Sequence, residues 1–173
     1  GLPSISDPGQ YLVNYARNKK FEVVCVPGPC AAITALVSSG INSKLFLFIG
    51  FVPKKGQERI RYLNLITENS YSSIVYESPK RVKDLLSELS DYCEESRIIH
   101  VAKELTKKHE QNWRGTLKEV SNKINSLDLK GEFTIVIAGA QEKKELLQGG
   151  HKLLKKDLED LINLGLKRSS AVS

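Results

Sequence analysis

The residues best suited to ligand chemistry form the short segment Pro27-Gly28-Pro29-Cys30-Ala31-Ala32, which follows the apolar run 22–26. The prolines fix φ and lack N–H donors, and Gly28 adopts conformations closed to residues with a Cβ, so the turn is sharp. The small side chains after it leave backbone N–H groups uncovered where a helix would begin. Because ligands of open α/β sheets collect at strand carboxyl ends, the segment predicts a floor for a flat or zwitterionic ligand. Alternatively, the small residues serve only close packing.

Other ligand motifs are missing from the sequence. Neither G-x-G-x-x-G nor G-x-x-x-x-G-K-[ST] occurs, which disfavours a phosphate cradle. The three cysteines, Cys25, Cys30 and Cys93, lack C-x-x-C spacing, and with three histidines they form no metal constellation. We therefore expect no metal, reduced thiols and a cytoplasmic location.

Basic residues cluster directly after several apolar runs. They are Lys54, Lys55 and Arg59, then Lys80 and Arg81, then Lys103, Lys107 and Lys108. The formal net charge of +6 also favours a polyanionic partner, with nucleic acid as the first candidate. Any one cluster alone is also typical of a solvated surface. Because each cluster follows a predicted strand, we expect them to share one edge of a sheet and contact phosphates.

Apolar periodicity predicts the elements that position these residues. We expect strands over 22–26, 45–51, 72–77, 97–102 and 132–139, with a short strand within 103–114. The runs 22–26, 45–51 and 132–139 are apolar enough to predict fully buried strands. We expect helices over 10–20, 29–39 and 57–69, from an N-cap at Ser78 with Pro79 at N1, from a capping box at Thr116, and over 153–164. This alternation predicts an α/β fold with a mixed sheet.

The polar stretch 41–44 predicts a boundary between two lobes. Residues 1–42 would be the end of a first lobe, 45–140 a complete second α/β lobe, and 143–173 a truncated C-terminal helical segment. The chain contains no methionine and its first nine residues have loop composition, so we expect a fragment cut at both ends. No segment approaches the ~20 apolar residues of a membrane span.

Several blocks of the chain also occur in a distinctive order. They are 1–9, 27–36, 48–54, 76–81, 103–107 and 131–133. In this order they resemble the ribosomal RNA small subunit methyltransferase I family, within the tetrapyrrole-methylase-like superfamily of S-adenosylmethionine enzymes. The resemblance covers residues 1 to about 140. It implies a two-lobed α/β fold, S-adenosylmethionine bound in the cleft between the lobes, and a homodimer.

The resemblance further implies a reaction, a partner and a set of pocket residues. The reaction would be 2′-O-methylation of a cytidine ribose in the decoding region of 16S rRNA, on small-subunit RNA or the 30S subunit. The implied cofactor-binding residues are Gly1, Leu2, Pro3, Ile5, Cys30, Ala31, Ala32, Tyr76, Glu77, Glu132, Phe133 and Thr134. Lys80 stands where the family usually has His, and Lys103 where it usually has Arg. The family's opening strand is absent, so we expect the fragment alone to be inactive.

Methyl transfer to a ribose hydroxyl is an in-line displacement, in which a protein aligns the reactants and a base takes the alcohol proton. Glu104, in the charged segment after the fourth predicted strand, is our candidate for the base or for the group that orients the hydroxyl. Alternatively, Glu104 pairs with neighbouring lysines on a solvated surface. Two other functions stay open: a tetrapyrrole (precorrin-type) methyltransferase, which needs no set of basic clusters, and a non-catalytic RNA-binding module.

Overall fold

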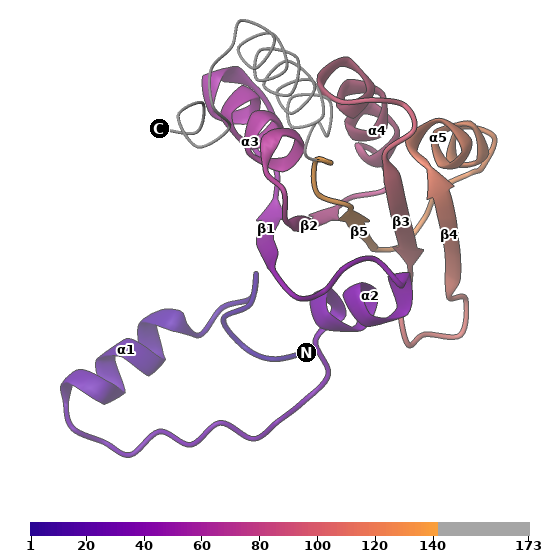
Figure 1. The fold of residues 1–173 in the computed structure, drawn as a ribbon. Helices are drawn as coiled ribbons and strands as arrows, with labels where there is room; N and C mark the ends of the chain where they lie inside the picture. Colours follow the sequence, from indigo (N-terminus) through magenta and orange to yellow (C-terminus); the bar gives the residue numbers. More distant parts are fainter. Residues whose placement is uncertain (142–173) are drawn as a thin grey trace, which may run out of the picture. The chain divides into compact units, whose positions relative to one another are not determined.

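The computed structural model describes residues 1–141 of the 173-residue chain. Contacts group residues 1–140 into one compact unit, which holds the helices and strands drawn in colour in Figure 1. The lobe boundary predicted in the stretch 41–44 falls inside this unit, and the division into two lobes stays a prediction. The helix predicted over 153–164 lies outside the described residues.

A mixed five-stranded sheet in the order β1-β2-β5-β3-β4 forms the centre of the unit. Its strands are β1 (Phe46–Phe51), β2 (Ser72–Glu77), β3 (Ile98–Lys103), β4 (Gln111–Thr116) and β5 (Phe133–Ile137). β1 is parallel to β2, β5 is antiparallel to both β2 and β3, and β4 is antiparallel to β3. β1, β2 and β3 therefore run in the same direction, and their carboxyl ends lie along the same end of the sheet, beside the start of β5. The predicted α/β class and mixed sheet are confirmed.

Helices cover both faces of this sheet (Figure 1). The helices of the unit are α1 (Gln10–Asn18), α2 (Ala31–Ser39), α3 (Gly56–Glu68), α4 (Val82–Tyr92) and α5 (Leu117–Asn125). On one face Ala35 and Leu36 of α2 pack in a cluster with Ala102 and Val136 of the sheet. On the other face α3, α4 and α5 contribute to a larger core. Since successive side chains of a strand point to opposite faces, the two hydrophobic clusters lie on opposite faces of the sheet.

Local sequence accounts for several of these elements. Val82, Leu85, Leu86 and Leu89 recur at helical spacing in α4, and each is at most 1% exposed, which confirms the predicted core face. The predicted capping box is also present: the Thr116 side chain accepts from the backbone N–H of residue 119, and the residue 119 carboxylate accepts from the Thr116 N–H.

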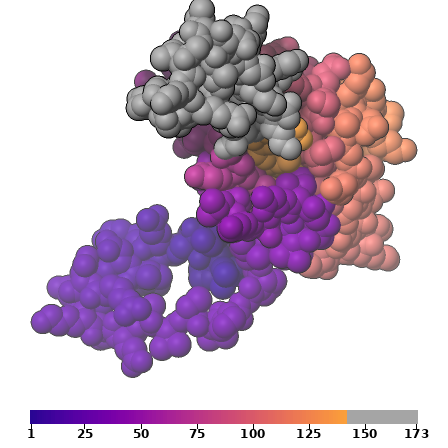
Figure 2. Space-filling view, viewed as in Figure 1, coloured from indigo at the N-terminus to yellow at the C-terminus, as the bar shows by residue number. Residues whose placement is uncertain are grey.

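The strand predicted over 22–26 is wrong. Residues 21–30 form no helix or strand, and Val24 and Val26 are 74% and 78% exposed. A β-branched run becomes a strand only when a neighbour pairs with its backbone, and none of the five strands pairs with this one. α1 likewise buries none of its residues. Figure 2 shows the indigo and purple N-terminal stretch with much of its surface uncovered.

Two further elements differ from prediction. β1 is an edge strand with only β2 beside it, so Phe46, Phe48 and Phe51 are partly exposed instead of fully buried. α4 begins at Val82, not at Pro79. The backbone N–H groups of Arg81 and Val82 both donate to the carbonyl of Ser78, so residues 78–81 form a turn that brings the chain from β2 into the helix.

Within residues 1–141, every helix is too short or too polar to cross a membrane.

His100 is a buried titratable residue on β3, paired in register with Val136 of β5 and Arg114 of β4. It is 3% exposed, and neither ring nitrogen has a hydrogen bond of good geometry in the structure. Burial lowers its pKa and the nearby Arg114 lowers it further, whereas the Asn112 side chain raises it by less than either. The structure therefore holds this imidazole neutral beside the cluster formed by α2.

We expect this histidine to make the unit less stable in acid. Below pH about 6.5 the His100 side chain takes up a proton in the unfolded chain but stays neutral in the folded protein. The free energy of unfolding should therefore decrease as the pH is lowered, with a slope approaching about 1.4 kcal/mol per pH unit. Urea unfolding between pH 5 and 8 measures this slope. His100→Leu should flatten it, whereas His109→Leu, at an exposed position, should not. Equal slopes in both variants would contradict the assignment.

Candidate functional site

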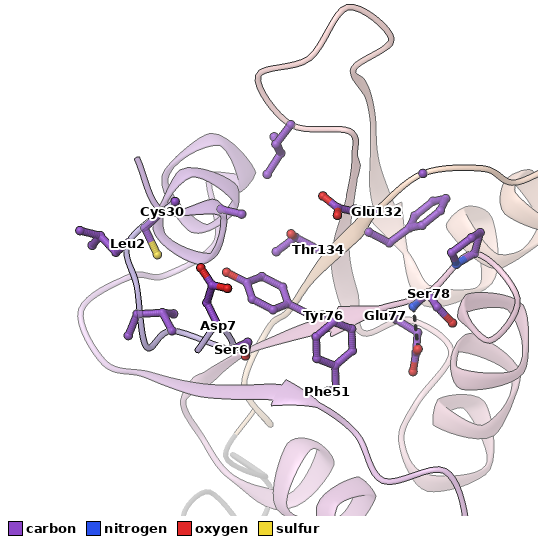
Figure 3. Close-up of a pocket in the computed structure, with 17 residues that line it drawn as sticks. Leu2, Ser6, Asp7, Cys30, Phe51, Tyr76, Glu77, Ser78, Glu132 and Thr134 are labelled. Carbon is purple, nitrogen blue, oxygen red and sulfur yellow. Dashed lines mark hydrogen bonds between the residues drawn. The ribbon is translucent and has the colours of Figure 1, made fainter. Parts of the chain in front are cut away.

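A cavity of about 490 Å³ opens at the edge where β1 and β2 end and β5 begins. Figure 3 shows Cys30 at one end of it, Ser78 at the other and Tyr76 between them. Its walls come from the N-terminal loop, the start of α2, the three strand ends and the loop after β3. The lining residues are Gly1, Leu2, Ile5, Ser6, Asp7, Cys30, Ala31, Phe51, Tyr76, Glu77, Ser78, Pro79, Leu105, Gly131, Glu132, Phe133 and Thr134.

The structure brings the predicted pocket residues together. All of them line this cavity except Pro3 and Ala32. Ala32 is 2% exposed and packs in the core beneath α2, one residue beyond the cavity surface. Cys30 at the N-cap of α2, Tyr76 near the end of β2 and Phe133 at the start of β5 meet at one site, as predicted, although Cys30 does not follow a strand. Their binding of a cofactor stays a prediction.

Sequence reasoning missed part of the lining. Ser6, Phe51 and Pro79 lie inside the blocks that carry the family resemblance, yet the resemblance did not single them out. Phe51 is opposite Tyr76 in the β1–β2 register, a neighbourhood that only the strand order reveals. Leu105 and Gly131 reach the cavity because β5 lies beside β3. For Ser6, Pro79 and Gly131, a predicted pocket residue within two positions in the sequence was the available signal.

Tyr76 joins α2 to the sheet at the cavity floor. Its hydroxyl accepts a hydrogen bond from the backbone N–H of Ala32 at 3.0 Å. Its ring packs edge-on against Phe48 and Phe51, with centroid distances of 5.2 and 5.8 Å. Burial and the neighbouring Cys30 raise the pKa of Tyr76, so the hydroxyl stays protonated. One of the helix N–H groups expected to be uncovered is thus occupied by a side chain.

Glu77 turns its carboxylate into the protein at the base of the 78–81 turn. Its side chain is 0% exposed. Oε1 accepts from the Ser78 backbone N–H at 2.7 Å and pairs with the Arg81 guanidinium at 2.6 Å, whereas Oε2 has no partner in the structure. The pair fixes the turn that carries Ser78 and Pro79 to the cavity.

Glu104 lies behind the cavity wall and is not one of the lining residues. Its Oε1 accepts from Lys107 Nζ and from the backbone N–H of Glu132, both at 2.9 Å. The bond from Lys107, together with the Glu132 N–H, lowers the pKa of Glu104. A carboxylate held in this way is a weaker proton acceptor, and the role of Glu104 as a base stays a prediction.

The predicted basic residues divide into two groups. Lys54, Lys55, Lys80 and Lys108 are exposed and make no ion pair with the residues that the structure describes; we call these four the basic rim. The other four, Arg59, Arg81, Lys103 and Lys107, already bond other groups of the protein. Arg59 is 8% exposed and bonds the Glu88 carboxylate and the Pro53 carbonyl, so it is poorly placed for RNA.

The remaining cations have side-chain partners. Arg81 pairs with Glu77, Lys107 with both Glu104 and Glu132, and Lys103 donates to the amide of Gln111 at 3.1 Å. Within residues 1–141 no group of three or more His, Cys, Asp or Glu side chains is arranged to hold a metal ion.

The mixed sheet, its helix-covered faces and the cavity at its strand ends define an α/β domain with a cavity of small-molecule size. The chain belongs to the family described as Tetrapyrrole (Corrin/Porphyrin) Methylases, whose model matches residues 1–121. Among its relatives, Ribosomal RNA small subunit methyltransferase I from Synechocystis sp. is 39% identical over 171 residues, which cover 99% of this chain and 61% of that protein. The protein of the same name from Hydrogenobaculum sp. is 42% identical, over 80% of this chain and 60% of that protein. The chain thus spans about 60% of their length.

Solved structures support the fold. The methyltransferase CobJ matches with a TM-score of 0.60 at 18% identity, over 81% of this chain and 62% of that chain. The cobalt precorrin-4 methyltransferase CbiF matches with a TM-score of 0.61 at 13% identity, over 80% and 61% of the two chains. Uroporphyrin-III C-methyl transferase from Thermus thermophilus, complexed with S-adenyl homocysteine, matches with a TM-score of 0.54 at 16% identity, over 80% and 62%.

Proposed function

We propose that the protein is an S-adenosylmethionine-dependent methyltransferase of small-subunit ribosomal RNA, and that its target is the 2′-hydroxyl of a cytidine in the decoding region. The observation that carries this proposal is the meeting of the family blocks at one cavity with the basic rim following the same strand ends. The names of the relatives at 36–42% identity support the RNA substrate. We also propose a cytoplasmic homodimer.

The cavity suits the cofactor in size and chemistry. Its volume of about 490 Å³ lies within the range of small-molecule sites. Ala31 and Cys30 offer a wall of small side chains, and Phe51 and Tyr76 offer aromatic surface for a flat base. The cofactor would supply an activated methyl group on a sulfonium. The chain's own residues would bind and align it.

The basic rim would hold the RNA. Lys54 and Lys55 follow β1 by a few residues, and Lys80 follows Pro79 of the cavity lining directly. These ammonium groups pair with no carboxylate of the described residues, so they can contact phosphates and release counterions. This arrangement would deliver a nucleotide to the cavity mouth.

A tetrapyrrole methyltransferase is the second candidate, because the solved structures that share the fold include a cobalt precorrin-4 methyltransferase and a uroporphyrin-III C-methyl transferase. Those proteins are only 13–18% identical to this chain, a level that supports the fold alone. A non-catalytic RNA-binding module is the third candidate. It would bind RNA without binding S-adenosylmethionine.

The decisive experiment combines cofactor binding with methyl transfer. Calorimetry should detect saturable binding of S-adenosylmethionine to the full-length protein, which is the form to use in all the cofactor and activity measurements. Labelled methyl groups should pass to 30S subunits, and the modified nucleotide should resist alkaline cleavage, since a 2′-O-methyl group blocks attack on the adjacent phosphate. Label on a tetrapyrrole but not on RNA would favour the second candidate, and RNA binding without cofactor binding the third.

The basic rim gives a separate prediction. Replacing Lys54 and Lys55 together by Ala should weaken binding of small-subunit RNA and reduce its log–log salt slope by about one unit per lost phosphate contact. Cofactor affinity should be unchanged, because neither side chain lines the cavity.

The matched control is the double replacement of Lys118 and Lys123 by Ala on α5, where Lys118 already pairs with Glu95. This control removes the same charge and should have a smaller effect on the slope. Equal slopes for the two double variants would show that the rim is not the RNA-binding face.

A further inference from the structure

Two chain segments that form one wall of the cavity are joined by a compact set of polar contacts. The segments are 104–107, after β3, and 131–132, before β5. The Glu104 N–H donates to the Glu132 carbonyl, and the Glu132 N–H donates to Glu104 Oε1, both at 2.9 Å. Lys107 Nζ bridges the carboxylates of Glu104 and Glu132, with 2.9 Å to each. The side chains thus continue the hydrogen-bond ladder beyond the end of the sheet.

The same contacts impose an unusual backbone. Glu104 and Thr106 have φ values of 52° and 64°, in the left-handed region that residues with a Cβ rarely occupy. The Thr106 N–H donates to the Glu110 carboxylate at 2.7 Å, which closes the loop on itself. Backbone of this kind costs free energy and persists where the surroundings determine it. Leu105, between the two left-handed residues, lines the cavity.

Gly131 shows how closely the two segments approach. Its φ is 91°, and a Cβ added to it would lie 2.5 Å from the carboxyl carbon of Glu104. Any side chain at this position would therefore displace the Glu104 carboxylate. Both Gly131 and Glu132 line the cavity, so a displacement here would move the wall.

We propose that Glu104 is a positioning residue: its carboxylate, through Lys107 and the Glu132 N–H, sets the wall that Leu105 and Glu132 present to the bound cofactor. The assignment rests on the proposed function for the identity of that ligand. Glu104 is suited to this role and not to proton transfer, because its Oε1 already accepts two hydrogen bonds and it does not line the cavity.

Two substitutions separate a positioning residue from a base. Glu104→Gln keeps an oxygen that can accept from the Glu132 N–H, whereas Glu104→Ala removes it. We expect Glu104→Ala to raise the Kd for S-adenosylmethionine about 10-fold, and Glu104→Gln to stay near the wild-type value. At saturating cofactor, the pH profile of kcat in Glu104→Gln should keep the shape of the wild-type profile, because no proton passes through the Glu104 carboxylate. A base would be lost equally in both variants, with the acidic limb of the pH profile, which reports ionisation of the base, altered, and that result would overturn the proposal.

Gly131→Ala tests the wall without removing the carboxylate. Its matched control is Gly56→Ala, because Gly56 has a similar φ of 84° but no atom within 4 Å of the place that a Cβ would take. Both changes strain the backbone, and only Gly131→Ala meets Glu104. We expect a raised Kd for Gly131→Ala alone, and a smaller added effect when Glu104 is already Ala, because the obstructing side chain is gone.

Hydrogen exchange at the Glu132 amide gives a readout that needs no ligand. Exchange should be faster in Glu104→Ala and Gly131→Ala than in wild type, Glu104→Gln or Gly56→Ala. Equal exchange in all five proteins would overturn the proposal. If exchange changes as expected but wild type binds no S-adenosylmethionine, the proposed function fails while the loop assignment stands. If wild type binds the cofactor and all variants bind it equally, the wall does not contact the ligand, and the proposal fails alone.

Discussion

Ala31→Leu should reduce the affinity for S-adenosylmethionine by more than about 100-fold while the unit stays folded. Ala31 is exposed at the first turn of α2 and lines the cavity, so the added carbons of Leu would enter space that we assign to the cofactor. Overfilling a packed contact costs about 1–3 kcal/mol, and a cofactor that no longer fits its site loses more binding free energy than that. Leu has nearly the helix propensity of Ala, and the position is not in the core, so stability should hardly change. Calorimetric titration measures the loss.

Val37→Leu is the matched control, since Val37 is 73% exposed on the same helix and does not line the cavity. It should bind cofactor as wild type does. Thermal unfolding of both variants separates a blocked site from a damaged fold. Wild-type affinity in a folded Ala31→Leu protein would show that Ala31 does not contact the cofactor. It would leave the assignment of the basic rim to RNA binding unchanged.

The parts of the fold that sequence predicts well are those whose pattern is complete within one segment. α4 carries its whole core face in four residues, and α5 carries its own capping box. The run 22–26 has strand composition but no pairing neighbour in the sheet, and composition cannot supply one. For β1 the strand itself was predicted correctly and only its burial was not: its phenylalanines suit a buried strand, yet its edge position leaves them partly exposed.

The site shows the same division between local pattern and spatial neighbours. The family blocks led to Cys30, Tyr76 and Phe133, because each lies in a block that can be recognised locally. Phe51 and Leu105 also lie in such blocks, but they were missed because their closeness to Tyr76 and Phe133 depends on the order β1-β2-β5-β3. Charge pairing is equally non-local. Lys54 and Arg59 are close in sequence, but Arg59 meets Glu88 on another helix and Lys54 stays exposed.

The second large effect is expected at the Glu77–Arg81 pair, and it should be asymmetric. Arg81→Met would leave a fully buried carboxylate with only the Ser78 N–H as a donor, which should cost about 3–5 kcal/mol in the free energy of unfolding. Glu77→Gln would leave Arg81, whose side chain is 25% exposed and can reach water, so the loss should be about 1 kcal/mol. Urea unfolding of each variant measures the difference.

The double variant Glu77→Gln/Arg81→Met decides whether the cost comes from the stranded charge. With the charge gone, it should be more stable than Arg81→Met alone, although it carries one more substitution. Lys118→Met serves as the comparison, because it breaks an ion pair with Glu95 in which both side chains are more than half exposed, and its effect should be small. If Arg81→Met costs no more than Lys118→Met, Glu77 finds other donors when Arg81 is removed. The 78–81 turn, which carries Ser78 and Pro79 to the cavity, would then be held by the backbone hydrogen bonds to the Ser78 carbonyl and not by the ion pair.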